Sequence, residues 1–373
     1  MIAQCNPVFC ITPPHMIEKI LAKGTEKQKE RALKVLKISA QFRGRRQSLT
    51  NISFPVQRTV RTEKHRLVYD AGFSENLPGT LVRGEGEDPV GDPAVNEAYD
   101  GAGQTYDLYY DVFKRNSIDD KGMHLISSVH YGEGYDNAFW DGEQMVYGDG
   151  DEDLPEEERL FNRFTIAIDI IGHELTHGVT QFEAKLAYYG QSGALNESFS
   201  DVFGSLVKQR ALNQKAGEAD WLIGQGLFTS KVNGQGIRSM KAPGTAYDDP
   251  ILGKDPQPGH MNDYVNTISD NGGVHINSGI PNRAFYICAS EIGGYAWEKA
   301  GRIWYIALRD KLQEGSDFQQ AANLTFSVAG EEYGTGSAEQ NAVKKGWAET
   351  GIIVEPGKKK ARRGILGVFC KKS

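Results

Sequence analysis

The stretch IGHELTHGVT, residues 171–180, limits the possible folds more than any other, because it places two histidines four residues apart. On an α-helix this spacing puts His173 and His177 on one face, one turn apart, where two imidazoles can hold one zinc ion. Glu174 stands beside them and can take a proton from water. Chance would give this pattern about once in a hundred chains of this length and histidine content. The stretch therefore predicts a helix that carries two zinc ligands.

A third ligand must come from another segment, and SGALNESFSD, residues 192–201, is the best source. The longer motif H-x-x-G-x-x-H is excluded, because Thr180 stands at the position of its glycine and Glu183 at the position of its last histidine. The later stretch predicts a second helix with Glu197 and Asp201 four residues apart. Glu197 would complete the ligand set and leave the fourth position to water, as a catalytic zinc requires. Asp201 would accept the free N–H of a ligand histidine. Two alternatives stay open, Glu183 as the ligand and Asp201 as a solvated acid.

The order of the expected elements indicates an α+β protein with two lobes. Short apolar runs between Gly and Asp turns predict strands at 65–70, 105–113, 123–131 and 144–151. After residue 160 the apolar spacing predicts helices at 165–180, 196–210, 277–291, 296–312 and 338–348. A β-rich N-terminal lobe followed by an α-helical C-terminal lobe would place the metal site in the cleft between them.

A separate leader precedes these lobes. Residues 12–42 predict two short helices, the first with an apolar stripe formed by Met16, Ile17, Ile20 and Leu21. The polar, glycine-containing stretch 42–51 predicts an exposed linker that is open to proteolysis. The leader and the start of the body are basic, with thirteen Lys and Arg against three Glu between Lys19 and Lys64. Such a segment can fold back onto an acidic body, and nucleic acid is the alternative partner.

The acidic counterpart lies at residues 149–158, which hold seven acids and no base. Its first part, DGDED at 149–153, hints at a calcium loop. Leu154 stands where an EF-hand needs glycine, so a solvated acidic turn is favoured.

The pairing of HELTH with GALNESFSD closely resembles the thermolysin-like neutral metalloproteases. NAFWDG (137–142), GIRSM (236–240) and DNGGVHINSGI (270–280) extend the resemblance over roughly residues 65–351. TPPHMIEKIL (12–21) resembles the pro-segment of the protealysin-type subgroup. The resemblance implies a two-lobed gluzincin fold and a zinc endopeptidase made as a self-processing precursor. We therefore expect a pro-segment at 1–50, a β-rich lobe at 51–185 that ends in the zinc-binding helix, a helical lobe at 186–351 and a basic tail at 352–373.

The resemblance also implies which residues act at the bond that is cut. Zinc would be bound by His173, His177 and Glu197, with Asp201 orienting a ligand histidine. Glu174 would be the base, and the oxyanion donors would be His275, oriented by Asp270, and Tyr188.

Further residues would hold the substrate. Asn137, the carbonyl of Ala138 and Arg238 would bind its backbone. The main specificity pocket would be lined by Phe161, Phe164, Ile170, Leu227 and Ile237. These apolar walls imply cuts on the N-terminal side of bulky hydrophobic residues.

One catalytic zinc is the expected cofactor, and bound calcium is doubtful. The family places carboxylates around a double-calcium region, of which Asp169 and Asp220 persist. Lys208, Leu222 and Gln225 stand where further carboxylates would be, and a lysine ammonium opposes a cation.

The expected partners are polypeptide substrates and the chain's own pro-segment as an intramolecular inhibitor, with the protein a monomer. The N-terminus lacks the basic region and long apolar core of a signal peptide, and no run approaches the ~18 apolar residues of a membrane span. We expect secretion by a route without a conventional signal peptide, with a cytoplasmic location as the alternative. Two other functions stay open, a catalytically inactive peptide-binding scaffold and a protease whose residues 12–64 bind nucleic acid.

Overall fold

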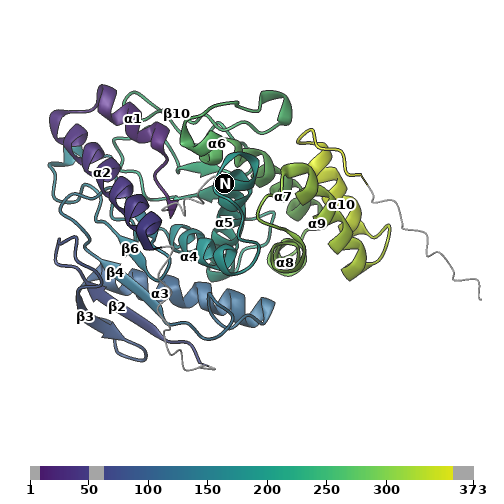
Figure 1. The fold of residues 1–373 in the computed structure, drawn as a ribbon, viewed down its shortest axis with the longest axis horizontal. Coiled ribbons are helices and arrows are strands. Elements are labelled where there is room, and N and C mark those ends of the chain that lie inside the picture. Colours follow the sequence, from purple (N-terminus) through teal and green to yellow (C-terminus); the bar gives the residue numbers. More distant parts are fainter. Residues whose placement is uncertain (1–8, 50–62, 356–373) are drawn as a thin grey trace, which may run out of the picture.

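A six-stranded sheet organises the first lobe in the computed structural model, which describes residues 9–49 and 63–355 (Figure 1). The strand order is β1-β5-β6-β4-β2-β3. β4 pairs in parallel with β2 and β6, and the other pairs are antiparallel. The strands are β1 Phe9–Cys10, β2 Arg66–Asp70, β3 Thr80–Gly84, β4 Leu125–Val129, β5 Ala138–Trp140 and β6 Met145–Tyr147. Because β1 belongs to the leader, the leader covers the edge strand β5.

The helix α3 (Pro93–Asp107) packs against this sheet and against α4. Its first turn is capped by Asp92, which accepts a hydrogen bond from the N–H of Ala94 at 2.9 Å. A π-helical turn, Leu108–Val112, continues it. The predicted strand at 105–113 is therefore wrong. Tyr109 and Phe113 instead pack against Phe203 of the second lobe, and this tertiary contact overrides their preference for strands.

Helices dominate the rest of the chain, as predicted. They are α4 Ile168–Phe182, α5 Gly190–Ala211, α6 Asp270–Asn277, α7 Gly279–Ile292, α8 Ala300–Ile306, α9 Phe318–Tyr333 and α10 Ala338–Ala348. The expected helices at 165–180, 196–210, 277–291 and 338–348 are confirmed. The expected helix at 296–312 corresponds to α8 and the π-helical turn Ala307–Lys311 that follows it, while α9 was not expected.

Short elements complete the second lobe. The two-stranded pairs are β7 Leu222–Ile223 with β8 Arg238–Ser239, and β9 Asp248–Asp249 with β10 Gly253–Lys254. Short 3₁₀ turns lie at Glu156–Glu158 and Met261–Asp263. In the part of the chain that the structure describes, no helix has both the length and the apolar character needed to cross a membrane.

The close approach of α4 and α5 brings the predicted metal ligands together. Two glycines permit it. A Cβ added to Gly204 would lie 2.4 Å from the carbonyl oxygen of Asp169, and one added to Gly172 would lie 3.0 Å from the Cα of Gly204. Any larger residue would push the helices apart. Gly172 directly precedes His173, and Gly204 lies two turns after Glu197, so the contact fixes the spacing of the ligands.

The leader forms α1 (Pro14–Lys23) and α2 (Glu26–Leu49), which lie along one side of the body (Figure 1). In this stripe Met16, Ile17 and Ile20 are at most 2% exposed, and Leu21 packs partly buried against the same core, so the predicted apolar face is confirmed. The predicted linker at 42–51 is wrong for residues 42–49, which continue α2 because most of them are good helix formers. The remainder of that linker lies outside the described residues.

Candidate active site

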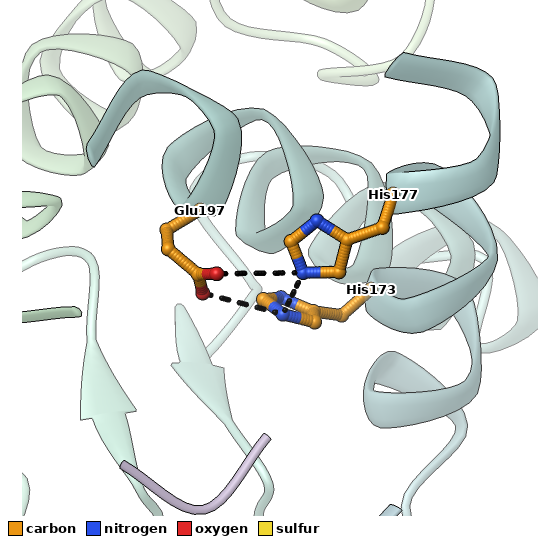
Figure 2. Close-up of side chains that lie close together, drawn as sticks. All are labelled: His173, His177 and Glu197. Atoms are coloured by element: carbon orange, nitrogen blue, oxygen red, sulfur yellow. Dashed lines mark hydrogen bonds and ion pairs between the residues drawn. The ribbon is translucent and has the colours of Figure 1, made fainter. Parts of the chain in front are cut away.

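Three side chains converge where α4 and α5 cross. His173 and His177 extend from α4 and Glu197 from α5, and all three are buried (Figure 2). The two Nε2 atoms lie 3.0 Å apart, and each lies 3.5 Å from an oxygen of Glu197. Among the described residues, this is the one group of His, Cys, Asp and Glu whose ligand atoms all lie within 4.8 Å of one another.

This group fits zinc in both donor type and spacing. Ligand atoms about 2.0–2.2 Å from a tetrahedral zinc lie about 3.3–3.5 Å apart, close to the observed 3.0–3.5 Å. The second oxygen of Glu197, Oε2, is buried without a hydrogen-bond partner in the described part of the chain, as expected of an atom reserved for a cation. The alternative ligand, Glu183, lies elsewhere, at the end of α4 in an ion pair with Arg115.

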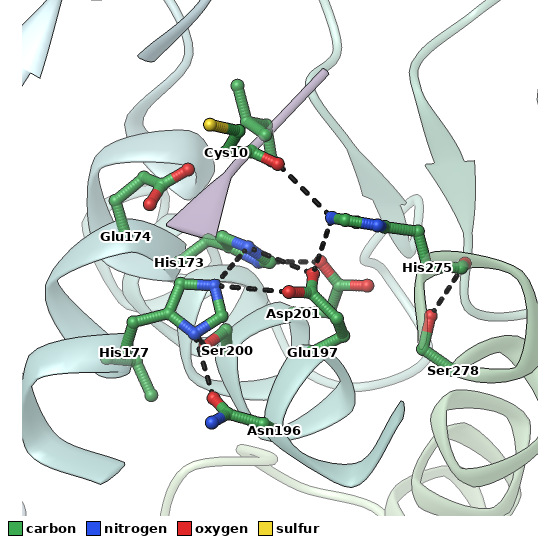
Figure 3. Close-up of polar contacts among 12 residues, drawn as sticks. Cys10, His173, Glu174, His177, Asn196, Glu197, Ser200, Asp201, His275 and Ser278 are labelled. Atoms are coloured by element: carbon green, nitrogen blue, oxygen red, sulfur yellow. Dashed lines mark hydrogen bonds and ion pairs between the residues drawn. The ribbon is translucent and has the colours of Figure 1, made fainter. Parts of the chain in front are cut away.

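Each histidine is oriented through its other ring nitrogen (Figure 3). Nδ1 of His173 lies 2.8 Å from Asp201, so Asp201 is no solvated acid. Nδ1 of His177 lies 2.8 Å from Oδ1 of Asn196 and 3.0 Å from the hydroxyl of Ser200. These contacts leave both Nε2 atoms for a metal. The sequence reading missed Asn196 and Ser200, although both lie within one turn of Glu197 and were open to the same helical argument.

Glu174 lies one residue beyond the first ligand and is completely buried. Its Oε2 accepts a hydrogen bond from the N–H of Trp140 on β5 at 3.2 Å, while its Oε1 has no hydrogen-bond partner among the described residues. Burial, followed by repulsion from Glu197, raises the pKa of Glu174 well above its ordinary value. A carboxyl group in this environment is suited to taking up and releasing a proton.

His275 approaches the same place from α6. It follows four successive residues with positive φ, Asp270 to Gly273, which turn the chain so that Asp270 binds back to it. The two oxygens of Asp270 contact the N–H of His275 at 2.8 Å and its Nδ1 at 2.5 Å. Burial opposes the charged form, but Asp270 and then Glu197 raise the pKa of His275 to about 9. The hydroxyl of Tyr188 donates to Glu197 and lies 3.2 Å from Nε2 of His275.

The leader crosses this group as an extended strand (Figure 3). The carbonyl oxygen of Cys10 lies 3.2 Å from Nε2 of His275. The N–H of Ile11 donates to the carbonyl of Ala138 at 3.2 Å, and the carbonyl of Ile11 accepts from Arg238 at 3.4 Å. The next N–H, that of Thr12, donates to Oδ1 of Asn137 at 3.0 Å. The three predicted substrate-backbone contacts thus meet one continuous piece of backbone.

Arg238 is held in place by Asp201. Both side chains are buried, and Nε and Nη2 of Arg238 donate to the two oxygens of Asp201 at 2.8 and 2.7 Å. Asn282, which the sequence reading missed, donates to the same carboxylate at 2.8 Å. Burial opposes ionisation, but Arg238 and then His173 hold the pKa of Asp201 below its ordinary value. One carboxylate therefore orients both a metal ligand and the arginine that reaches the leader.

The five residues predicted to line the specificity pocket are buried. Each of the five is at most 1% exposed, and all belong to the same apolar core: Phe161, Phe164, Ile170, Leu227 and Ile237. The rings of Phe161 and Phe164 lie 5.8 Å apart, and Ile170 and Ile237 both face Gly224.

Lys208 lies in the region for which the sequence makes bound calcium doubtful. Its ammonium lies 3.0 Å from Asp169, 2.9 Å from Asp220 and 2.8 Å from the carbonyl of Leu222, and its side chain is 8% exposed. A protein cation therefore pairs with both acids that persist there.

Comparisons with known proteins identify related sequences and a related structure. Residues 37–181 match the family model of the thermolysin metallopeptidase catalytic domain, and residues 184–352 match that of its alpha-helical domain. An extracellular metalloprotease of Pectobacterium carotovorum is 48% identical over 362 residues, which are 94% of this chain and 98% of the relative. The protease PrtS of Photorhabdus is 48% identical over 94% of both chains. The solved precursor of protealysin, a metalloproteinase from Serratia proteamaculans, matches with a TM-score of 0.83 and 51% identity, over 92% of this chain and 99% of that one.

Proposed function

The chain belongs to the thermolysin family of metallopeptidases and is a metalloendopeptidase, and from this premise we propose how it works. It cuts polypeptides with one zinc ion held by His173, His177 and Glu197. It is made as a precursor that its own leader inhibits. The observation that carries the proposal is the leader backbone lying across the metal-binding group as a substrate would.

The chemistry divides among the residues around that group. Zinc supplies polarisation of the carbonyl and a lower pKa for water. Glu174 takes a proton from the attacking water and passes it to the leaving nitrogen. Nε2 of protonated His275 and the hydroxyl of Tyr188 donate to the oxygen that becomes negative, and Asp270 keeps His275 charged. Removing one such donor raises the activation barrier by about 3–4 kcal/mol.

The orientation of a bound substrate is inferred from the orientation of the leader strand. Its strand pairs antiparallel with β5, in the register Phe9 with Trp140 and Cys10 with Phe139. If a substrate takes the same path, the bond between positions 10 and 11 lies at the oxyanion donors. Arg238 then binds the carbonyl of the residue after the cut, as it binds that of Ile11.

Inhibition follows from the same contacts. The leader fills the backbone sites of β5 and Arg238, and a polypeptide cannot bind there until it leaves. The thiol of Cys10 lies 3.6 Å from the hydroxyl of Ser39, and Nε2 of His15 lies 3.0 Å from that of Tyr247. Both side chains are thus engaged with other groups, which favours exclusion of substrate over a fourth metal ligand from the leader.

We propose that cuts fall before bulky hydrophobic residues. Ile11, which stands in the position after the cut, is apolar and completely buried. The five residues assigned to the pocket carry no charge. Burial of a Leu or Phe side chain is worth about 1.5–3 kcal/mol, enough to dominate selection at one position.

The related enzymes named as extracellular support secretion of this one, and we propose that it proceeds without a conventional signal peptide. We keep the division into residues 1–50, 51–185, 186–351 and 352–373 as part of the proposal. The monomeric state is also proposed. Residues 356–373, most of the basic tail, lie outside the described residues.

Metal analysis and casein hydrolysis test the function together. The parent should contain one zinc per chain and lose hydrolysis when a chelator removes it. Glu197→Ala should lose both zinc and activity, whereas Glu183→Gln, which changes the alternative acid, should keep both. Zinc that persists in Glu197→Ala would refute the ligand assignment. A zinc-loaded, leader-free protein that binds casein without cutting it would favour the inactive scaffold.

Cleavage-site profiling of the active enzyme tests the specificity separately. Leu, Phe, Ile and Val should dominate at the position after the cut. A majority of charged residues there would contradict the apolar pocket.

A further inference from the structure

The body binds the guanidinium of Arg31, a residue of the leader helix α2, through a group of acidic residues. Arg31 is 9% exposed. Its Nη1 lies 2.9 Å from the carbonyl of Gly150, 3.2 Å from Asp151 and 3.8 Å from Asp136. Its Nη2 lies 2.7 Å from both oxygens of Asp153. We call Asp136, Gly150, Asp151 and Asp153 the arginine cage. The expected solvated turn at 149–153 is therefore wrong for Asp151, which is 1% exposed.

Contacts within the body hold the cage residues in place. One oxygen of Asp151 accepts from the N–H groups of Leu160 and Phe161 at 2.8 and 3.0 Å, which aims the other at the cage. Oδ1 of Asp136 is buried without a hydrogen-bond partner among the described residues, and Asp136 is 6% exposed. Gly134 leaves room for the guanidinium, since a Cβ there would lie 2.9 Å from its Cζ. These groups keep space and hydrogen-bond acceptor oxygens for a planar cation.

The cage borders a pocket of about 530 Å³ at its Gly150 and Asp153 side. The lining of this pocket includes these two cage residues and the neighbouring Gly134. Further acids line this pocket and outnumber its two basic side chains: Asp92, Glu133, Asp149 and Glu152 against His130 and Arg163. Such an excess of one sign attracts cations.

The cage also borders the path of a substrate. Thr12, which takes the second position after the cut in the proposed register, donates from its N–H to Asn137 and from its hydroxyl to the carbonyl of Asp136 at 3.2 Å. The side chain of that same Asp136 belongs to the cage. A long side chain in the second to fourth position after the cut can therefore reach it.

We propose that, once the leader has gone, the arginine cage is a specificity site that binds an arginine of the polypeptide substrate in place of Arg31. Removal of the leader withdraws the one guanidinium seen there and leaves Asp136 and Asp151 buried without it. An arginine from a substrate restores the same contacts. The inference rests on the proposed leader removal and substrate register.

Peptide kinetics with the leader-free enzyme test this. A peptide series carries arginine, or its neutral isostere citrulline, at the second, third or fourth position after one fixed cleavage site. At one of these positions arginine should lower KM about 10-fold with kcat unchanged, because the contact is remote from the reacting bond. Asp153→Asn should abolish the difference without altering hydrolysis of the citrulline peptide. Glu157→Gln, which removes an exposed charge of the same loop, should retain it.

A second experiment separates failure of the cage from failure of the proposed processing. In the full-length Glu174→Ala chain, Arg31→Ala empties the cage whether or not the leader can be removed. Ethylguanidinium should raise the melting temperature of this variant more than ethylammonium does. It should have no such effect when Arg31 is present or when Asp136→Asn is added.

Three results would overturn the assignment. The first is equal KM for the arginine and citrulline peptides at all three positions. The second is no rescue of Arg31→Ala by ethylguanidinium. The third is rescue of that variant by calcium chloride instead, which would make the cage a metal site. Intact mass reports leader removal separately, so a chain that fails to process itself would refute only the proposed self-processing.

Discussion

Replacing Asp201 by asparagine should damage both the stability of the protein and its metal site. Oδ1 of Asp201 contacts His173 and Arg238, and Oδ2 contacts Arg238 and Asn282, at 2.7–2.8 Å. Each oxygen thus meets two donors, so an amide NH₂ in either orientation would face donors only. Arg238, 2% exposed, would keep one hydrogen bond to the remaining amide oxygen and its 3.4 Å contact with the carbonyl of Ile11, but it would lose the carboxylate with which it forms its ion pair. An uncompensated buried charge of this kind costs about 3–5 kcal/mol.

Thermal unfolding and metal analysis of Asp201→Asn, in a Glu174→Ala background that prevents self-digestion, measure both effects. The melting temperature should fall by about 10 °C, and zinc affinity by about 10–100-fold because His173 loses its orienting partner. Asp310→Asn is the matched control. Asp310 also binds an arginine, Arg309, through both oxygens, but its side chain is 41% exposed, so the loss should stay within about 1 kcal/mol. Equal stability and zinc content in Asp201→Asn and its parent would refute this reasoning.

Three further predictions follow from other contacts. Lys208→Met should destabilise the protein by about 3–5 kcal/mol in thermal unfolding, because Asp169 stays buried without its cation, and calcium should stabilise this variant more than the parent. His130 lies between Asp92 and Asp149, and chiefly its hydrogen bond to Asp149 raises its pKa to about 9. The protonated His130 should stabilise the protein by about 2 kcal/mol after allowing for partial exposure. This stabilisation should be complete below pH 6.5 and disappear as pH rises through 9. Urea unfolding measured over this pH range should show the loss of stability in the parent and not in His130→Gln. Ile11→Asp should release the leader, because the substitution places a charge at a completely buried position. Faster hydrogen exchange in α1 would show the release, and unchanged exchange would contradict it.

The metal site could be predicted from sequence because its determinants are local. The i, i+4 spacing of His173 and His177 fixes their common face on any helix, and the same spacing relates Glu197 to Asp201. The partners of His177 were equally accessible, since Asn196 and Ser200 flank Glu197 on the same helix.

Other features depend on contacts between distant segments, which no local pattern records. Residues 105–113 have the composition of a strand, but packing against Phe203 makes them helical. The register of β1 on β5 joins residues about 130 positions apart in the sequence. The arginine cage likewise depends on the contact between α2 and residues 136–153. Because the local sequence does not show this contact, the acidic loop resembles a solvated turn.

The central claim, an endopeptidase restrained by its own leader, is tested most directly by intact mass and N-terminal sequencing of the parent beside Glu174→Ala. The parent should lose its leader by a cut near residues 46–56, a range that lies partly outside the described residues. Glu174→Ala should stay at full length, and a trace of active parent should trim it at the same place. If Glu174→Ala loses the same segment when it is produced alone, another protease removes the leader and self-processing is wrong.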